Sequence, residues 1–123
     1  MDRRTALAGM AAMTLAATTR AQTGNFPTKP IRIILPFNAG SGTDSTARAY
    51  GEIMSRMLGQ PVIVENRPGA SGLIAIQAVK ALPADGYTIF SGTTSPMCVM
   101  PVLNKNLPYD PFKDFRPLHG LSM

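Results

Sequence analysis

The 123-residue sequence lacks the residue clusters that most metal sites require. It contains one cysteine, Cys98, and one histidine, His119. One residue of each kind cannot supply a common zinc site, and a single cysteine cannot form an internal disulfide. Met97, Val99 and Met100 surround the cysteine in the sequence. Because a free cysteine packs as a small hydrophobe, we expect this thiol to be buried.

Motifs for nucleotide binding and nucleophilic catalysis are also missing. Gly40-Ser41-Gly42 does not match Gly-x-Ser-x-Gly, and neither a Gly-Lys-Ser/Thr loop nor Gly-x-Gly-x-x-Gly occurs. Asp44 and Glu65 are not spaced as an acid/base pair, and a helix-start charge and a surface carboxylate explain them more simply. An exported hydrolase acting through Ser41 stays an alternative, but His119 lies near the end and is no obvious base. The sequence therefore predicts neither an enzyme nor a cofactor.

Basic residues are present but not clustered. The formal charge is +5, there is no tryptophan, and lysine and arginine are scattered singly outside the N-terminal segment. A nucleic-acid site would need a basic cluster or a series of stacking aromatic residues. We therefore predict no nucleic-acid partner.

The first 21 residues have the pattern of an export signal. Arg3 and Arg4 supply positive charge, Ala6 to Ala17 form a short apolar run, and Thr19-Arg20-Ala21 offers small residues for cleavage. About a dozen apolar residues are too few to span a membrane. We expect residues 1–21 to be removed and the protein to act in the periplasm. Export would use the Sec route, or the twin-arginine route that an Arg-Arg pair suggests.

Strand-type and helix-type patterns alternate along the rest of the chain. Nearly continuous apolar runs predict buried strands over 31–35, 62–64 and 87–90. Between and after them, helical patterns span 43–58, 73–82 and 96–103, and residues 104–117 read as irregular surface chain. This order predicts an α/β fold with a parallel sheet and flanking helices.

The first predicted helix has an apolar side and recognisable ends. The apolar positions with helical spacing are Ala47, Tyr50, Met54, Met57 and Leu58. Thr43 or Asp44 can cap its start, and Gly59 fits its C-terminal cap. Gly51 inside the helix costs about 1 kcal/mol relative to alanine, and the sequence offers no reason for it other than close packing. In the second helix, Ile74, Ala78 and Leu82 share a four-residue spacing.

Two turns rich in small residues follow the first and third predicted strands, at residues 40–44 and 91–95. The carboxyl ends of parallel strands lie along one edge of a sheet, so both turns should offer N–H and hydroxyl donors at that edge. A turn between a buried strand and a helix start also gains the positive end of the helix dipole. We predict that the first turn holds the carboxylate of a small ligand.

Five segments, in order along the chain, carry a family pattern. They are Phe26–Ile34 with Pro36–Asp44, Gly59–Val62, Val64–Ala70, Pro83–Thr88 and Leu107–Phe115. Together these segments resemble Bug-type (TctC-like) extracytoplasmic solute receptors, the substrate-binding proteins of tripartite tricarboxylate transporters. The chain departs from the pattern at Asn38 and Ser41, where alanine and glycine are usual, and at Met100, where asparagine commonly precedes the proline.

The resemblance implies a type II periplasmic-binding-protein (Venus-flytrap) fold of two domains. Such a receptor captures a carboxylated metabolite and delivers it to a membrane permease with one large and one small subunit. The resemblance also implies that two turns hold the ligand through backbone N–H groups, hydroxyls and bridging waters. The implied ligand residues are Phe37, Ala39, Gly40, Ser41, Gly42, Thr43, Asp44, Gly92, Thr93, Thr94 and Ser95.

The length of the chain adds a further expectation. Family members have about 300 residues, a size typical of two domains, so residues 22–123 are expected to form an incomplete N-terminal lobe. The alternative is a non-functional remnant of a truncated gene. In that case, uncovered sheet edges and apolar faces would favour aggregation.

Overall fold

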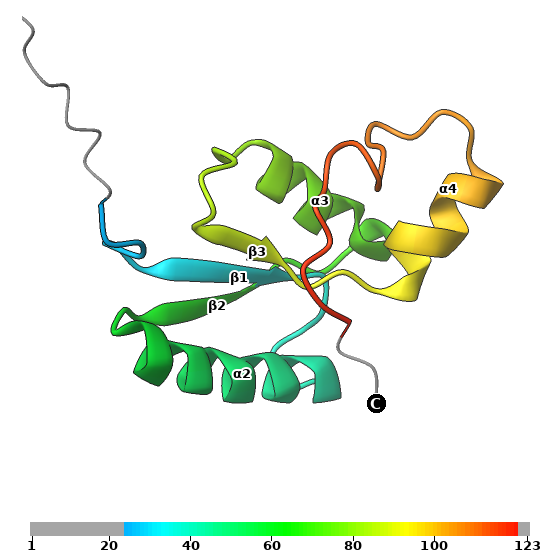
Figure 1. Ribbon diagram of the computed structural model, residues 1–123. Coiled ribbons are helices and arrows are strands. Elements are labelled where there is room, and N and C mark those ends of the chain that lie inside the picture. Colours follow the sequence, from blue (N-terminus) through cyan, green and yellow to red (C-terminus); the bar gives the residue numbers. More distant parts are fainter. Residues whose placement is uncertain (1–23, 121–123) are drawn as a thin grey trace, which may run out of the picture.

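The computed structural model describes residues 24–120, and the predicted export signal lies outside these residues. A three-stranded parallel sheet forms the centre of the described chain (Figure 1). β1 (Ile31–Leu35) is the middle strand, β2 (Val62–Asn66) pairs with it on one side, and β3 (Thr88–Phe90) pairs on the other. The predicted parallel sheet with flanking helices is confirmed.

β1 is buried on both faces because helices cover both sides of the sheet. α2 (Gly42–Leu58) packs on the face that carries Ile33 and Leu35, and α3 (Leu73–Lys80) lies on the opposite face (Figure 1). Successive side chains of a strand point to opposite faces, so Ile34 is directed toward the α3 side. A nearly continuous apolar strand is what this two-sided cover requires.

The predicted apolar side of α2 is confirmed only in part: Ala47 is buried and Met54 packs against the core, but other positions face outward. Tyr50 is 45% exposed and Met57 is 80% exposed. The residues of α2 that are buried are Asp44, Ala47 and Gly51. A Cβ atom at Gly51 would lie 3.4 Å from Cγ1 of Val62, an ordinary van der Waals distance, so this position of the helix faces β2 directly. The helix faces the sheet through Asp44, Ala47 and Gly51, which leaves part of its apolar side outward.

The two ends of α2 are fixed by local caps. Ser41 is the N-cap, and its Oγ accepts a hydrogen bond of 3.2 Å from the N–H of Asp44. The expectation that Thr43 or Asp44 caps the helix was therefore wrong, because the helix already begins at Gly42. At the other end, Gly59 adopts the left-handed conformation and donates its N–H to the Ser55 carbonyl at 3.0 Å, as predicted.

The chain after β2 crosses the end of β1 before it enters α3. The N–H of Arg67 donates to the Leu35 carbonyl at 2.7 Å, and a short turn, η1 (Ala70–Gly72), follows. In α3 the buried residues are Ala75 and Ile76, whereas Ile74 of the predicted spacing is 47% exposed. The helix is only eight residues long, so its first turns, which lie against the sheet, determine its buried side.

The helical segment after β3 consists of two short pieces, η2 (Ser95–Val99) and α4 (Met100–Leu103). Pro96 is the buried residue of this segment. Cys98 is exposed, so the prediction of a buried thiol was wrong. The apolar sequence around Cys98 misled the prediction because this segment extends beyond the sheet and packs through few of its residues.

Residues 104–117 are irregular, as predicted, but they are anchored to the domain. The Tyr109 hydroxyl donates to the Pro96 carbonyl at 2.5 Å, and Tyr109 is only 7% exposed. Lys80 of α3 donates to a carboxylate oxygen of Asp114 at 2.6 Å. The segment therefore fixes the start of η2 against the rest of the fold. Among the described helices, none has both the length and the apolar character needed to cross a membrane.

Candidate functional site

The strand order places a topological switch point at one end of the sheet. The chain leaves β1 toward β2 on one side and later returns to β3 on the other. In open parallel sheets, ligands bind at such a reversal, beyond the carboxyl ends of the two strands. The turns that follow β1 and β3 border this point (Figure 1). These are the two turns that the sequence singled out.

Contacts beneath the two turns hold them together. The N–H of Ser91 donates to the Ile34 carbonyl at 2.9 Å. A Cβ atom at Gly72 would lie 3.0 Å from Cγ of Pro96 and 3.4 Å from Cβ of Pro36. The turn after β1, the start of α3 and the start of η2 therefore meet at this glycine, whose φ of 94° also favours glycine.

The first turn presents free backbone donors. The first N–H groups of a helix have no intrahelical partner. In α2, the Ser41 N–H donates to the Asn38 carbonyl at 3.3 Å, and the Asp44 N–H is capped by the Ser41 hydroxyl. Within residues 24–120, the N–H groups of Gly42 and Thr43 have no protein partner. Two donors at the positive end of a 17-residue helix can bind an anion.

Asp44 is directed into the protein rather than toward solvent. It is 3% exposed. Its Oδ2 accepts hydrogen bonds from the Gly40 N–H at 2.9 Å and from Nε of Arg48 at 3.0 Å. Its Oδ1 accepts one from Nδ2 of Asn66 at 2.9 Å. The same Asn66 nitrogen donates to the Phe37 carbonyl at 3.0 Å, so the end of β2 is tied to the turn.

These hydrogen bonds favour the charged form of Asp44. The bond from Arg48 is the largest cause, followed by those from Gly40 and Asn66, and together they lower the pKa of Asp44 from 3.8 to about 2. Burial acts in the opposite direction and is outweighed. Asp44 is therefore an ionised, internally paired carboxylate at neutral pH.

The second turn, Gly92–Ser95, offers mainly hydroxyl groups. Gly92, Thr94 and Ser95 are exposed and Thr93 is half-buried. The Thr93 carbonyl accepts a hydrogen bond of 3.1 Å from the Met97 N–H. A Cβ atom at Gly92 would lie 2.9 Å from Cγ of Met97. The turn thus folds tightly against the start of η2.

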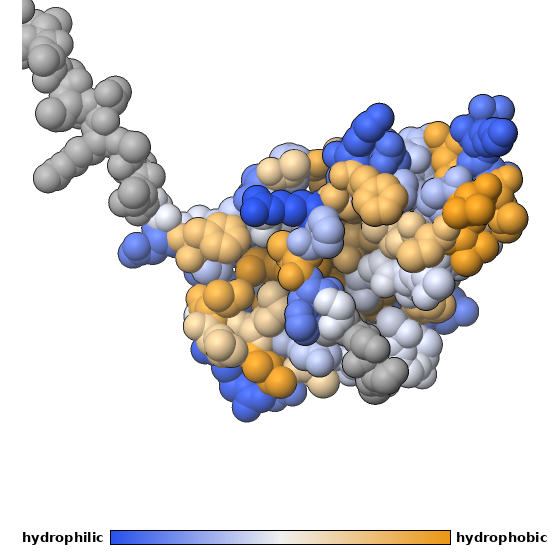
Figure 2. All heavy atoms as spheres, turned by 45° about the vertical axis from the view of Figure 1, so that its right-hand side comes forward, coloured by the Kyte–Doolittle hydropathy of each residue, from blue (hydrophilic) through white to orange (hydrophobic). Residues whose placement is uncertain are grey.

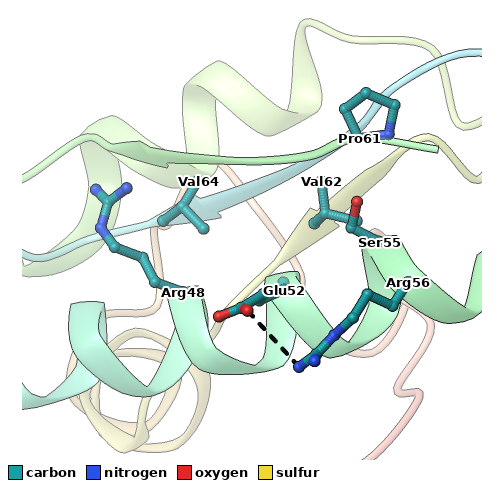
Figure 3. Close-up of a pocket in the computed structure, with 8 residues that line it drawn as sticks. Arg48, Glu52, Ser55, Arg56, Pro61, Val62 and Val64 are labelled. Carbon is teal, nitrogen blue, oxygen red and sulfur yellow. Dashed lines mark ion pairs between the residues drawn. The ribbon is translucent and has the colours of Figure 1, made fainter.

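A hollow lies between α2 and β2 (Figure 3). Val62 and Val64 form its apolar wall, and Glu52 and Arg56 of α2 form an ion pair of 3.7 Å at its rim. None of the eleven predicted ligand residues lines it. In the part of the chain that the structure describes, no group of three histidine, cysteine or acidic residues is placed to hold a metal ion.

Comparison with known proteins identifies the family. The profile of the TctC family, described as "Tripartite tricarboxylate transporter family receptor", matches residues 46–123. The chain belongs to this family. Relatives include a UPF0065 protein from Bordetella bronchiseptica, 46% identical over 98 residues, and BugT from Bordetella pertussis, 35% identical over 119 residues. The family resemblance in the sequence is confirmed, and TctC members are solute-binding receptors rather than enzymes.

The TctC chain described here corresponds to a fraction of its relatives. The match covers 80% of this chain and 29% of the B. bronchiseptica protein, and 96% of this chain and 36% of BugT. MatC from Rhodopseudomonas palustris, solved with malate, has a TM-score of 0.69 and 36% identity over 75% of this chain and 31% of its own. An R. palustris protein solved with adipate has a TM-score of 0.65 and 36% identity over 71% and 29%. The fold is thus consistent with a partial first lobe of a periplasmic binding protein.

The structure adds residues that the sequence did not single out. Arg48 and Asn66 contact Asp44, and Tyr109 anchors the start of η2. Arg48 follows Asp44 by four residues, the spacing at which opposite charges meet on a helix, so this pair had a readable signal. Asn66 and Tyr109 lie in two segments of the family pattern, Val64–Ala70 and Leu107–Phe115. Their contacts had no local signal, because they depend on strand register and on the path of an irregular segment. Glu65, predicted as a surface carboxylate, is paired with Arg32 at 2.6 Å.

Proposed function

We propose that this chain forms part of a periplasmic receptor that binds a small carboxylate for a tripartite tricarboxylate-type transporter. The observation that carries the proposal is the pair of free N–H groups, on Gly42 and Thr43, at the switch point of the sheet. Membership of a receptor family supports the same function. So do two structural neighbours, which were solved with malate and with adipate.

In this proposal, the carboxylate lies across the start of α2 and is closed in by the second turn. The N–H groups of Gly42 and Thr43 donate to its oxygens, and hydroxyls add further donors. The hydroxyl-bearing residues of the two turns are Ser41, Thr43, Thr93, Thr94 and Ser95. Phe37, Ala39 and Gly40 shape the turn, and Gly92 allows the second turn to pack closely. Malate and adipate share carboxylates but differ in chain length, which fits recognition of the carboxylate itself.

The proposal also includes the route and the partners. Residues 1–21 would direct export and then be removed, and residues 22–123 would form an incomplete N-terminal lobe. A second lobe would close over the ligand, and the receptor would deliver it to the large and small permease subunits. Periplasmic location of structural neighbours supports this arrangement.

The test uses ¹⁵N–¹H NMR spectra of the purified chain with malate, adipate or citrate at up to tens of millimolar. We expect concentration-dependent shifts of the Gly42, Thr43 and Gly92–Ser95 amides, with Gly59 at the far end of α2 as the internal control. The uncharged diamide of adipate should leave these amides unmoved. A folded chain whose amides in these two turns do not respond to any of the three carboxylates would contradict the proposal.

One observation favours the alternative of a non-functional remnant. Apolar side chains gather on the exposed end of the molecule that carries α4 (Figure 2). Val102 is 80% exposed, Leu103 71% and Phe112 88%, and such patches promote association. Size-exclusion chromatography and a thermal melt separate the two ideas. A monomer with a sharp transition favours the receptor lobe, whereas aggregation without a transition favours the remnant.

A further inference from the structure

The carboxylate of Asp44 is an anion that the protein itself supplies at the first turn. Its two oxygens accept three hydrogen bonds of 2.9–3.0 Å, from the Gly40 N–H, Nε of Arg48 and Nδ2 of Asn66. Its side chain is only 5% exposed. A ligand oxygen would therefore have to displace an existing internal bond to reach the Gly40 N–H, and it would meet a like charge there.

We propose that Asp44 is a positioning residue, a built-in anion that fixes the turn so that only the Gly42 and Thr43 N–H groups face the ligand. This inference deepens the proposed function and rests on it for the ligand's identity. It assigns Asp44 a role different from that of a ligand contact. It also explains how Asp44 can lie next to a site that binds the carboxylate of a ligand. The charge of Asp44 is matched by Arg48, and its oxygens point inward.

Asn66 extends the hydrogen bonds around Asp44 to three elements. Its Nδ2 donates to the Phe37 carbonyl at 3.0 Å and to Oδ1 of Asp44 at 2.9 Å, and its Oδ1 accepts from Nη2 of Arg48 at 3.1 Å. The turn, the first two turns of α2 and the end of β2 therefore move together. A fully satisfied polar network of this kind restricts a site to one geometry.

The decisive experiment is chemical rescue of Asp44→Ala by formate. The substitution removes the carboxylate and leaves the donors of Gly40, Arg48 and Asn66 around a space of carboxylate size. We expect Asp44→Ala to melt at a lower Tm than the natural chain. Added formate should raise its Tm along a saturating curve by about 4–8 °C. In formate, the Gly42 and Thr43 amide signals should return to their positions in the natural chain measured in the same buffer.

Three controls test whether formate acts at the donors that Asp44 normally occupies. Asp44→Asn fills the space with a side chain of the same shape, so its Tm should not respond to formate. Asp85→Ala removes a different paired carboxylate, which binds exposed Lys29 at 2.8 Å, and should show no saturable response. Formamide, neutral but similar in shape, should not rescue Asp44→Ala. Equal responses in all variants, or no formate response in a folded Asp44→Ala chain, would overturn the inference.

A measurement on the natural chain covers the case in which Asp44→Ala does not fold. The Gly40 amide proton, bonded to Oδ2 of Asp44, reports protonation of that carboxylate. Its chemical shift should stay constant as the pH falls through 3.8. It should change only near pH 2, where Asp44 titrates, or where the chain unfolds in acid. A midpoint near 3.8 would refute the paired, inward-facing carboxylate. Neither experiment uses a dicarboxylate, so failure of the proposed ligand class would be seen separately.

Discussion

A proline at position 42 tests directly whether the start of α2 binds the ligand. Gly42 is the first helical residue, its φ is not positive, and a Cβ atom there would meet nothing within 4 Å. Proline is well suited to this position, where its missing N–H breaks no intrahelical bond. The preceding residue, Ser41, is extended at φ −70° and ψ 160°, which a following proline requires. Gly42→Pro should therefore fold and lose one donor.

The magnitude follows from the bond that is removed. A hydrogen bond to a charged group contributes about 1.5–3 kcal/mol, so the dissociation constant for a carboxylate should rise about 10- to 150-fold. The ring carbon that replaces the N–H acts in the same direction, because it occupies the space next to the ligand. The free energy of unfolding should stay the same or rise by about 0.4–1 kcal/mol, since proline restricts the unfolded chain.

The assay is an NMR titration with whichever of malate, adipate and citrate shifts the natural chain most, read at the Thr43 and Thr94 amides. Gly42→Ala is the matched control, because it keeps the N–H and adds a methyl group in open space. We expect Gly42→Ala to bind like the natural chain and Gly42→Pro to bind much more weakly. If both variants bind equally while both remain folded, the start of α2 is not the anion site.

Three further changes test the supporting structure. Gly51→Leu should lower the free energy of unfolding in urea by about 1–3 kcal/mol through a clash with Val62. Gly51→Ala should change this free energy by no more than about 1 kcal/mol. Equal values for the two variants would show that the helix–sheet contact is loose. Tyr109→Phe should cost about 1 kcal/mol or more, because a buried carbonyl loses its donor, and Tyr87→Phe, at an exposed hydroxyl, should cost less. Hydrogen bonds, first from an arginine and then from a backbone N–H and an amide, hold the pKa of Asp44 at about 2 rather than 3.8. The stabilising contribution of ionised Asp44 is therefore complete above about pH 4 and is lost as the pH falls toward 2. Over that range, Asp44→Asn should lose less stability than the natural chain. Parallel curves of unfolding free energy against pH would contradict the lowered pKa.

The sequence was sufficient for the framework of the fold. The apolar run Ile31–Leu35 predicts a strand buried on both faces, and the structure places it in the middle of the sheet. Gly59 and Pro61 mark the end of α2 at the correct residue. These features depend on neighbours within a few positions, so local patterns are enough to read them. The position of the two turns at one edge follows from the parallel sheet alone.

Features set by contacts across the fold were not predictable. The buried side of α2 depends on which of its residues face β1 and β2, and helical spacing alone does not encode that orientation. The inward direction of Asp44 depends on Asn66, which lies at the end of β2, 22 positions later in the chain. Exposure of Cys98 depends on where a short helical segment leaves the sheet. Each of these is decided by tertiary packing.

The backbone nature of the proposed site explains why departures from the family pattern need not disturb it. Asn38 contributes its carbonyl, which accepts the Ser41 N–H at 3.3 Å, and any residue can supply that atom. Ser41 stands where glycine is usual, yet its hydroxyl caps α2 and leaves the next two N–H groups free. Only Gly40, with a φ of 84°, depends on its residue type for backbone reasons. Substitution at position 38 should therefore leave carboxylate binding unchanged, whereas a β-branched residue at position 40 should abolish it by distorting the turn.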